Sequence, residues 1–203
     1  GRPRFIQSKD DRREATHYML DGRGGGKIAL CADNEIEGMS EESYFLHLKA
    51  IDLANGVRHC LIERRTPFIK LNIDFDVFEI SGIPLSDEMI QRYVYIYQQT
   101  LRKFYTSLDC EESINNLLIA VVCTTDPKLV EKTDGNGEKR TYMKTGIHVI
   151  FPNLIVNTDQ ALTIRQAVLG SFKSELGPRS EPNTWEDVVD DTIYLGNGLR
   201  MVG

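Results

Sequence analysis

The feature that most constrains the fold is the segment at residues 68–79, FIKLNIDFDVFE. Apolar and polar residues alternate along it, which predicts a β-strand whose side chains point to opposite faces in turn. Asp74 and Asp76 then share one face, and the apolar residues beside them share the other, where we expect the core. Two adjacent carboxylates repel each other, so the pair indicates either a site for a divalent cation or a solvated strand end. Glu79, which we expect one step further along the same face, is a third carboxylate or the edge of the sheet.

Composition narrows the class of protein. Of the 203 residues, 41% are hydrophobic and 27% are charged, which is typical of a folded chain with room for one large domain. No apolar run is long enough to span a bilayer and no signal-peptide pattern opens the chain, so we expect no membrane partner. The four cysteines contain no Cys-x-x-Cys pair, which favours reduced thiols in an intracellular compartment. The net charge of −6 leaves room for a local basic groove, because phosphate contacts are local.

The first third of the chain predicts a small αβ unit. Residues 1–16 are polar and indicate a flexible lead-in to a domain that covers 17–203. The glycine-rich stretch 21–27 lies between two expected strands and predicts a hairpin turn rather than a phosphate-binding loop, because Ile28 stands where a Ser or Thr should hold magnesium. The basic pair at 64–65 either lies in a solvated turn or reaches phosphate. The chain starts without Met and ends within an apolar segment, so we expect a fragment of a longer protein.

The rest of the chain alternates between helical and strand patterns. Helices are expected after the caps Ser40, Ser86 and Thr158. The apolar run 117–123 predicts a central strand covered on both faces. The polar stretch 124–140 predicts a long loop with its tip at 134–137.

The segment 144–152 predicts a second long strand. Its apolar residues alternate with His148, which therefore lies on the face away from the core. A lone His in a strand is more often a satisfied structural residue than a functional one, and the segment alone does not separate the two interpretations.

The order of these elements resembles the archaeo-eukaryotic primase superfamily, including the primase-polymerases. It is closest in character to the primase halves of primase-helicases from large DNA viruses. The motifs that carry the resemblance are, in chain order, Asp74-Phe75-Asp76, Lys144 with Gly146-Ile147-His148, and Asp190 with Tyr194 and Arg200. The sequence differs from the family at Gly146, where Ser is more common, so a hydroxyl is either missing or supplied by Thr145.

The resemblance implies a nucleotidyltransferase that makes RNA or DNA primers on a single-stranded DNA template for DNA replication. Its substrates would be NTPs or dNTPs, and two Mg²⁺ or Mn²⁺ ions would assist the transfer. The metal-binding and catalytic residues it implies are Asp74, Asp76 and Asp190, and the nucleotide-binding residues are Lys144, His148 and Arg200. It further implies a hexameric helicase domain on the same full-length chain and, for a viral protein, a replication compartment in the host cytoplasm or nucleus.

The fold that the resemblance implies is α+β. An antiparallel sheet resembling an RNA-recognition module would pack beside an N-terminal αβ unit, with the active site in the cleft between them. Two rival interpretations stay open. A metal-dependent nuclease also uses clustered carboxylates and a lysine, although no lysine lies within a residue or two of Asp76 on its own strand. A non-catalytic nucleic-acid-binding module is the other.

Overall fold

The computed structural model describes residues 15–19, 26–31, 33–57, 61–63, 66–80, 82–105, 111–133 and 137–197. The chain divides into two compact units. The first comprises residues 1–65 with 197–203, and the second comprises residues 66–196. The class is α+β with antiparallel sheets, as the sequence predicts.

The first unit is a small αβ arrangement. Its elements are β1 (His17–Met19), β2 (Gly26–Ile28), β3 (Glu35–Ile36), β4 (Met39–Ser40), α1 (Glu41–Ala54) and β5 (Leu61–Glu63). The strands β2, β1 and β5 form an antiparallel sheet in that order, and β3 pairs with β4. Ser40 caps α1 as predicted, and the core contains Ile28, Phe45 and Leu61.

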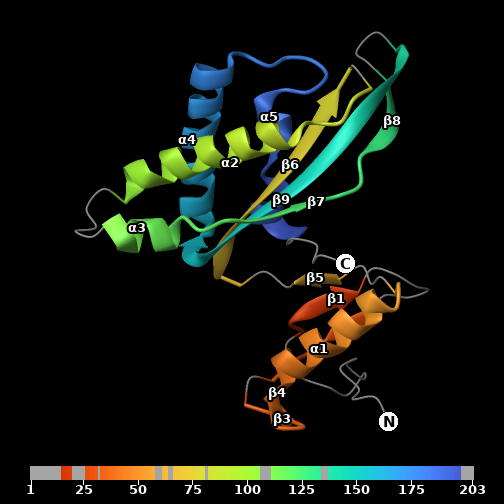
Figure 1. The fold of residues 1–203 in the computed structure, drawn as a ribbon, viewed down its shortest axis with the longest axis vertical. Coiled ribbons are helices and arrows are strands. Elements are labelled where there is room, and N and C mark those ends of the chain that lie inside the picture. The colour runs from red at the N-terminus through yellow and green to blue at the C-terminus, as the bar shows by residue number, and fades with distance from the viewer. Residues whose placement is uncertain are drawn as a thin grey trace. The chain divides into compact units, whose positions relative to one another are not determined.

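The second unit is larger and contains every expected catalytic motif up to residue 196. Its elements are β6 (Phe68–Glu79), α2 (Asp87–Phe104), α3 (Glu111–Leu117), β7 (Val121–Thr124), β8 (Lys128–Thr133), β9 (Lys139–Asn157), α4 (Thr158–Leu176), α5 (Trp185–Val188), β10 (Val189–Asp190) and the π-helical turn η1 (Ile193–Asn197), whose last residue falls at the unit boundary. Its sheet has the order β10-β6-β9-β7, and β8 also pairs with β9 (Figure 1).

The long strand β9 organises this sheet, because β6 pairs along one side of it and β7 and β8 follow each other along the other side. All of these pairings are antiparallel. The register between β6 and β9 shifts between Lys70 and Leu71, which face Ile155 and Phe151 respectively. Pro152 has no backbone N–H and lies in the part of β9 that the shift leaves unpaired with β6, so the bulge accommodates it.

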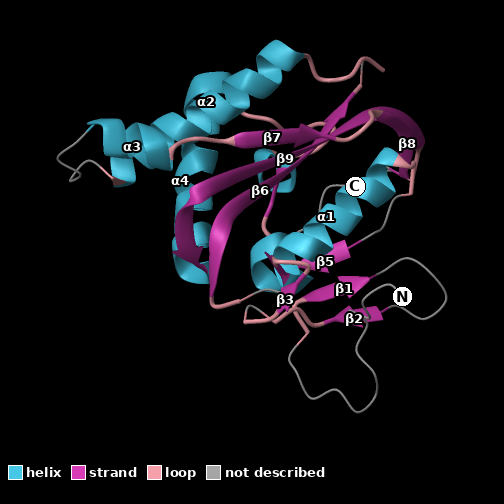
Figure 2. Cartoon of the chain, turned by 60° about the horizontal axis from the view of Figure 1, so that its bottom comes forward, coloured by secondary structure: helices cyan, strands magenta, loops and turns pink. Residues whose placement is uncertain are grey.

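The helices α2 and α4 cover one face of the sheet (Figure 2). The residues of β6 that point toward them, Leu71, Ile73, Phe75 and Val77, are fully buried. Phe75 lies at the centre of an aromatic cluster, with ring centroids 5.9 Å from Tyr93 of α2 and 6.1 Å from Phe172 of α4. The tyrosines on this side of α2 therefore belong to the core.

Three expectations about secondary structure are wrong in detail. The apolar run 117–123 is not a central strand: α3 ends at Leu117, and β7 is a short strand whose Val121 and Val122 are exposed. The stretch 124–140 is not one long loop, because β8 and the start of β9 form a hairpin around the predicted tip, of which 134–136 lie outside the described residues. The cap of α4 is Asn157, one residue before Thr158, and Gln160 completes its capping box.

Among the described helices, none has the length and apolarity needed to cross a bilayer.

The aromatic cluster predicts where the second unit is most sensitive to truncation. Phe75→Ala removes a fully buried ring and should lower the free energy of unfolding by about 3–5 kcal/mol, measured by urea denaturation. Phe68 lies on the same strand and is 65% exposed, so Phe68→Ala should change the free energy of unfolding by no more than about 0.5 kcal/mol. Equal losses in the two variants would contradict this assignment of the core.

Candidate functional site

The strand β6 presents its two aspartates on the face that the helices leave uncovered. Residues 71, 73, 75 and 77 are buried beneath α2 and α4, whereas Asp74 and Asp76 alternate with them and keep 21% and 32% of their side-chain surface. The predicted strand and the predicted faces of Asp74 and Asp76 are confirmed. The local cause is the period of two in the strand, which sends the apolar residues to the core and the carboxylates to the other side.

The neighbouring strand β9 brings the second motif to the same place. His148 faces Asp74 directly, Gly146 faces Asp76, and Lys144 faces Phe78. Residues that face each other across an antiparallel pair lie on one side of the sheet, so all of these share the face of the aspartates. We call this the site face.

The third motif reaches the site face from the far end of the chain. In β10, Asp190 faces Asp74 on the side of β6 that β9 does not occupy. The hydroxyl of the buried Tyr194 donates a hydrogen bond to the carbonyl of Asn72 in β6, which anchors the segment that follows Asp190. The site face therefore consists of three rows across the strands: Asp190–Asp74–His148–Cys123, Asp76–Gly146 and Phe78–Lys144–Lys128.

Acidic and basic side chains contact each other within and between these rows. Lys144 Nζ lies 2.7 Å from Asp76 Oδ2, and His148 Nε2 lies 3.4 Å from Asp74 Oδ1. Burial raises the pKa of the Asp74 carboxyl above its ordinary value of 3.8, and the charges of Asp76 and Asp190 raise it further, while His148 and Lys144 act in the opposite direction. Burial is therefore the main reason for the raised pKa of Asp74, and the neighbouring charges act on it in both directions.

The chemistry of this donor set suits a hard divalent cation, because carboxylate oxygens are the ligands that Mg²⁺ and Mn²⁺ prefer. The side chains as they stand have other partners. Asp76 bonds Lys144, and the two oxygens of Asp190 accept bonds from the backbone N–H and the hydroxyl of Thr192, at 2.9 and 2.6 Å. Within the described ranges, no three His, Cys, Asp or Glu side chains form a ready-made metal-binding group. The residue types fit a cation, and binding it would require Asp76 and Asp190 to exchange these partners.

A hydroxyl does reach the site face near Gly146, but it does not come from Thr145. Thr145 is buried on the helix side, where its Oγ1 accepts a hydrogen bond of 3.1 Å from the backbone N–H of Leu85. Thr125, just after β7, instead bonds the carbonyl of Gly146 through its N–H, at 2.9 Å. A Cβ atom on Gly146 would lie 2.8 Å from the Thr125 hydroxyl and 3.8 Å from Asp76 Oδ1. Glycine at 146 thus makes room for the Thr125 hydroxyl beside Asp76.

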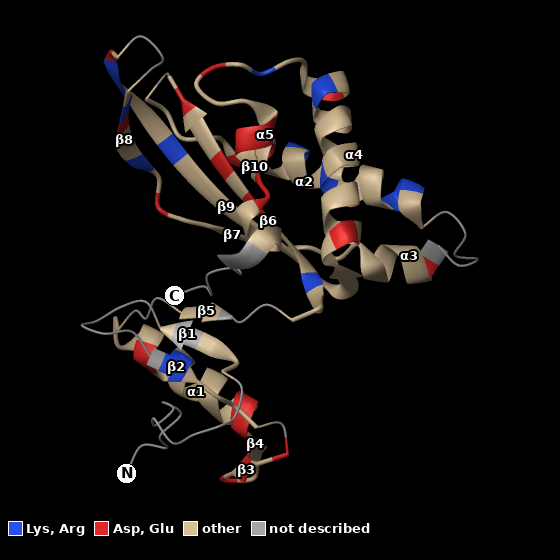
Figure 3. Ribbon diagram, turned by 180° about the vertical axis from the view of Figure 1, so that it is seen from behind, with Lys and Arg blue, Asp and Glu red and all other residues tan. Residues whose placement is uncertain are grey.

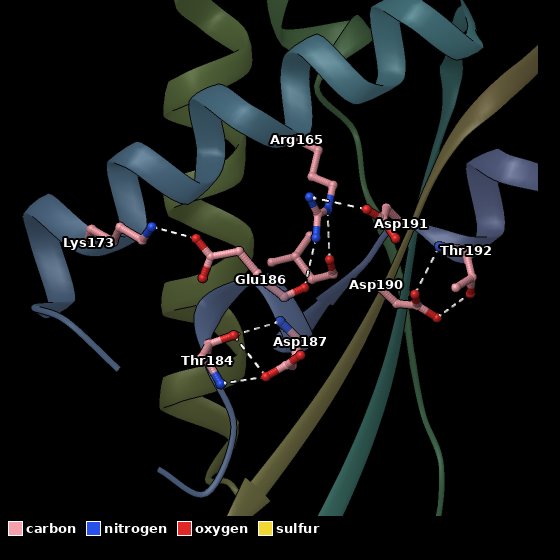
Figure 4. Close-up of polar contacts among 9 residues, drawn as sticks. Arg165, Lys173, Thr184, Glu186, Asp187, Asp190, Asp191 and Thr192 are labelled. Carbon is pink, nitrogen blue, oxygen red and sulfur yellow. Dashed lines mark hydrogen bonds and ion pairs between the residues drawn. The ribbon is translucent and has the colours of Figure 1, made fainter. Parts of the chain in front are cut away.

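Arg165 of α4 holds the segment that carries Asp190 (Figure 4). Its Nε donates a hydrogen bond of 2.8 Å to the carbonyl of Val189, and its Nη2 donates one of 2.7 Å to the carbonyl of Glu186. Its Nη1 lies 3.5 Å from Asp191 Oδ2. Because Arg165 is itself buried and β10 is very short, these contacts replace the long ladder that would otherwise position a strand.

Arg179 and Asn183 hold the end of β6 in a similar way. Asn183 Nδ2 donates a hydrogen bond of 2.7 Å to the carbonyl of Asp76, and Arg179 donates to the carbonyl of Phe78. Arg179 Nη1 also pairs with Glu79 at 3.2 Å. Glu79 therefore lies on the helix side. The expectation that it shares the face of Asp76 is wrong, because the two positions are three apart and the side chains of a strand change face with each residue.

Sequence reasoning missed Arg165, Arg179 and Asn183. The only signal they give is that they are polar residues in or beside a helical pattern, and their hydrogen bonds to backbone carbonyls identify them as structural anchors. Several expectations fall outside the described residues: Arg200, the pair at 64–65, residues 21–25 of the glycine-rich stretch and residues 1–14 of the lead-in. The strands on either side of the glycine-rich stretch, β1 and β2, pair antiparallel.

Comparison with known proteins agrees with this arrangement. The family model described as "C962R protein N-terminal AEP domain" matches residues 35–203, which is most of the chain. The chain belongs to this family of archaeo-eukaryotic primase-like domains from large DNA viruses. Membership confirms the resemblance stated from the sequence and, at a coarse level, implies a nucleotidyltransferase of the primase-polymerase type. A search of curated proteins finds no match.

The raised pKa of Asp74 predicts a pH-dependent cost to folding. Between pH 3.8 and the raised value, the folded state binds more protons than the unfolded state, so stability falls as the pH rises through this window. Asp74→Asn removes the charge and should raise the free energy of unfolding at neutral pH, in buffer with a chelator. The gain should disappear below pH 3.8, where the wild-type carboxyl is protonated in both states.

The matched control is Asp159→Asn, which removes an exposed carboxylate from the first turn of α4 and should give no gain at either pH. Urea denaturation at the two pH values measures both variants. A loss of stability at neutral pH in Asp74→Asn would contradict the role assigned to burial.

The contacts of Arg165 predict a large effect from one helix position. Arg165→Met should cost roughly 3 kcal/mol or more of unfolding free energy, because the buried carbonyl of Val189 and the partly buried carbonyl of Glu186 lose their donor. It should also speed amide hydrogen exchange in β10, where Arg165 fixes the backbone.

Lys173 of the same helix pairs with the side chain of Glu186 while half exposed, so Lys173→Met should cost about 1 kcal/mol at most. Similar costs for Arg165→Met and Lys173→Met would show that Arg165 is not an anchor.

Proposed function

We propose that this domain joins nucleotides on a single-stranded DNA template and so makes primers for DNA replication. The observation that supports the proposal most directly is the row Asp190–Asp74–His148 on the site face. Three residues from distant parts of the chain meet in neighbouring register positions, beside Asp76 and its partner Lys144. Nucleotidyl transfer needs clustered carboxylates next to cationic donors for phosphate, and this face offers both.

In this proposal Asp74, Asp76 and Asp190 would hold two Mg²⁺ or Mn²⁺ ions. When bound, the ions lower the pKa of the attacking 3′-hydroxyl and neutralise charge on the leaving pyrophosphate. The burial of Asp74 and the repulsion among the three carboxylates favour a cation at this position, because a cation relieves both costs.

The basic residues of the site face would bind the triphosphate. Lys144 lies two rows from His148 on the same face, and its ammonium can leave Asp76 for a phosphate oxygen when a cation takes over that carboxylate. His148 would donate a hydrogen bond through its imidazole, and Thr125 would add a neutral hydroxyl beside Asp76. Arg200, in the segment that follows η1, completes the proposed set.

The proposal includes the finer expectations about architecture and partners. The sheet of the second unit would be of the RNA-recognition-module type, and its site face would open on a cleft toward the N-terminal αβ unit. NTPs or dNTPs would be the substrates, a hexameric helicase domain would follow on the full-length chain, and the protein would act in a viral replication compartment.

A primer-synthesis assay on single-stranded DNA tests the proposal, with Mg²⁺ or Mn²⁺ and with ribonucleotides or deoxyribonucleotides in separate reactions. Wild-type protein should join nucleotides into short products. Asp74→Asn and Asp76→Asn should each reduce incorporation by at least a hundredfold, on the order of 3 kcal/mol in transition-state stabilisation, because each removes a charge that holds the ions. Asp159→Asn, on the helix side, should retain wild-type activity. A folded Asp74→Asn, Asp76→Asn double variant that still incorporates nucleotides would refute the assignment.

One observation favours a second candidate, a metal-dependent nuclease. The sequence offers no lysine close to Asp76 on its own strand, but Lys144 of the adjacent strand contacts that carboxylate at 2.7 Å, which is an arrangement that nucleases can use. Incubation of end-labelled DNA with Mg²⁺ and no nucleotide separates the two activities. Cleavage that Asp76→Asn abolishes would favour the nuclease, and intact DNA would favour primer synthesis.

A further inference from the structure

The hairpin formed by β8 and the start of β9 extends the site face with positive charge. Lys128 of β8 faces Lys144, and Lys132 faces Arg140. Lys144 lies on the site face, and the alternation along β9 puts Arg140 on the same face. Lys128 and Lys132 of β8, which face these two residues, therefore lie on the site face as well. We call these four residues the basic strip. Figure 3 shows Lys and Arg along β8 and the adjoining part of β9, next to the acidic residues of β6.

The strip puts like charges directly opposite each other twice. Such cross-strand pairs are destabilising unless an anion lies between them. Lys144 pairs with Asp76 at 2.7 Å and Arg140 pairs with the exposed Glu138 at 3.3 Å. Among the described residues, neither Lys128 nor Lys132 has a carboxylate within ion-pairing distance.

The ammonium groups also gather on one side chain. Lys132 Nζ lies 3.5 Å from the centre of the Phe78 ring, and Lys144 Nζ lies 5.6 Å from the same ring. Phe78 is in the row next to Asp76, so the strip begins at the carboxylates without a break. The aromatic face stabilises Lys132 without neutralising it, which leaves the charge of Lys132 available to a ligand.

The other face of the hairpin differs. In the register it presents Leu129, Glu131, Thr133, Thr141 and Met143, with Lys139 as its cation. The whole chain carries a formal charge of −6, so the accumulation of cations on one face is local. A local basic surface on an acidic protein indicates an anionic partner at that surface.

We infer that the basic strip binds the sugar-phosphate backbone of a nucleic-acid strand where that strand meets the carboxylates. Its two rows of cations stand on backbone positions four residues apart, roughly 13 Å along the strands, which leaves room for more than one phosphate. The strip is one strand pair wide, about 4.8 Å, so it follows a single backbone. The inference rests on the proposed function, since it identifies the strand that the same site face would act on.

Binding of fluorescently labelled oligothymidylate by the full chain, without metal or nucleotide, tests the inference. The test variant is Lys128→Gln, Lys132→Gln, which spares Lys144. The control is Lys103→Gln, Lys139→Gln, which loses the same charge from α2 and from the other hairpin face. All four side chains are exposed, so circular dichroism and thermal melting should match the wild type for both.

The measurement is the slope of log affinity against log salt. The test variant should bind several-fold more weakly, and its slope should be shallower by roughly 0.7 for each lysine that contacts a phosphate. The control should keep the wild-type slope. An unchanged slope in the test variant, an equal change in the control, or a wild type that does not bind DNA would each overturn the inference.

The nucleotide provides the second arm, because a triphosphate shares the chemistry of the backbone. The test variant should bind ATP and dATP as the wild type does. Lost nucleotide affinity with an unchanged DNA slope would assign the strip to the triphosphate and overturn the inference. Failure of the proposed function would give a different result, namely a wild-type protein that synthesises no primer. The slope of log affinity against log salt is measured without catalysis, so the two failures can be told apart.

Discussion

The antiparallel register of β6 between β9 and β10 is the constraint on which the rest of the second unit depends. It puts His148 on one side of Asp74 and Asp190 on the other. The same register sends Phe75 and its apolar neighbours toward α2 and α4, where the aromatic cluster forms. Slipping either pairing by one residue would turn the charges into the core and the aromatic rings into solvent, so the packing of the core specifies the geometry of the site.

Polar side chains from the helix side hold the backbone at the short strand β10 and at the end of β6. Arg165 bonds the backbone around Asp190, and Asn183 with Arg179 bonds the backbone at the end of β6. These donors come from α4 and the segment after it, on the helix side of the sheet. The carboxylates can thus repel one another on the site face while their backbones stay fixed from behind, because each buried carbonyl has a donor.

Charge on the site face changes sign along the strands. Carboxylates dominate the rows around Asp74, Lys144 and Phe78 form the transition, and the hairpin beyond them is basic. Clustered acids favour cations and clustered bases favour phosphates, so one continuous face offers both halves of what phosphoryl chemistry on a polymer requires. The family to which the chain belongs implies, at a coarse level, nucleotidyl transfer, which is a chemistry of this kind.

The sequence by itself determined the strand at 68–79, the faces of Asp74, Asp76 and His148, and the family, because alternation and motif order are local properties. It misjudged the run 117–123 and the stretch 124–140, since apolar composition does not distinguish an exposed edge strand from a covered one and polar composition does not exclude a hairpin. Only the tertiary structure decided that Asp190 lies beside Asp74, that Thr125 rather than Thr145 reaches the site face, and that Arg165 and Arg179 are anchors. These facts depend on which segments pair across long sequence separations and on what each side chain is buried against, and neither is encoded in local pattern.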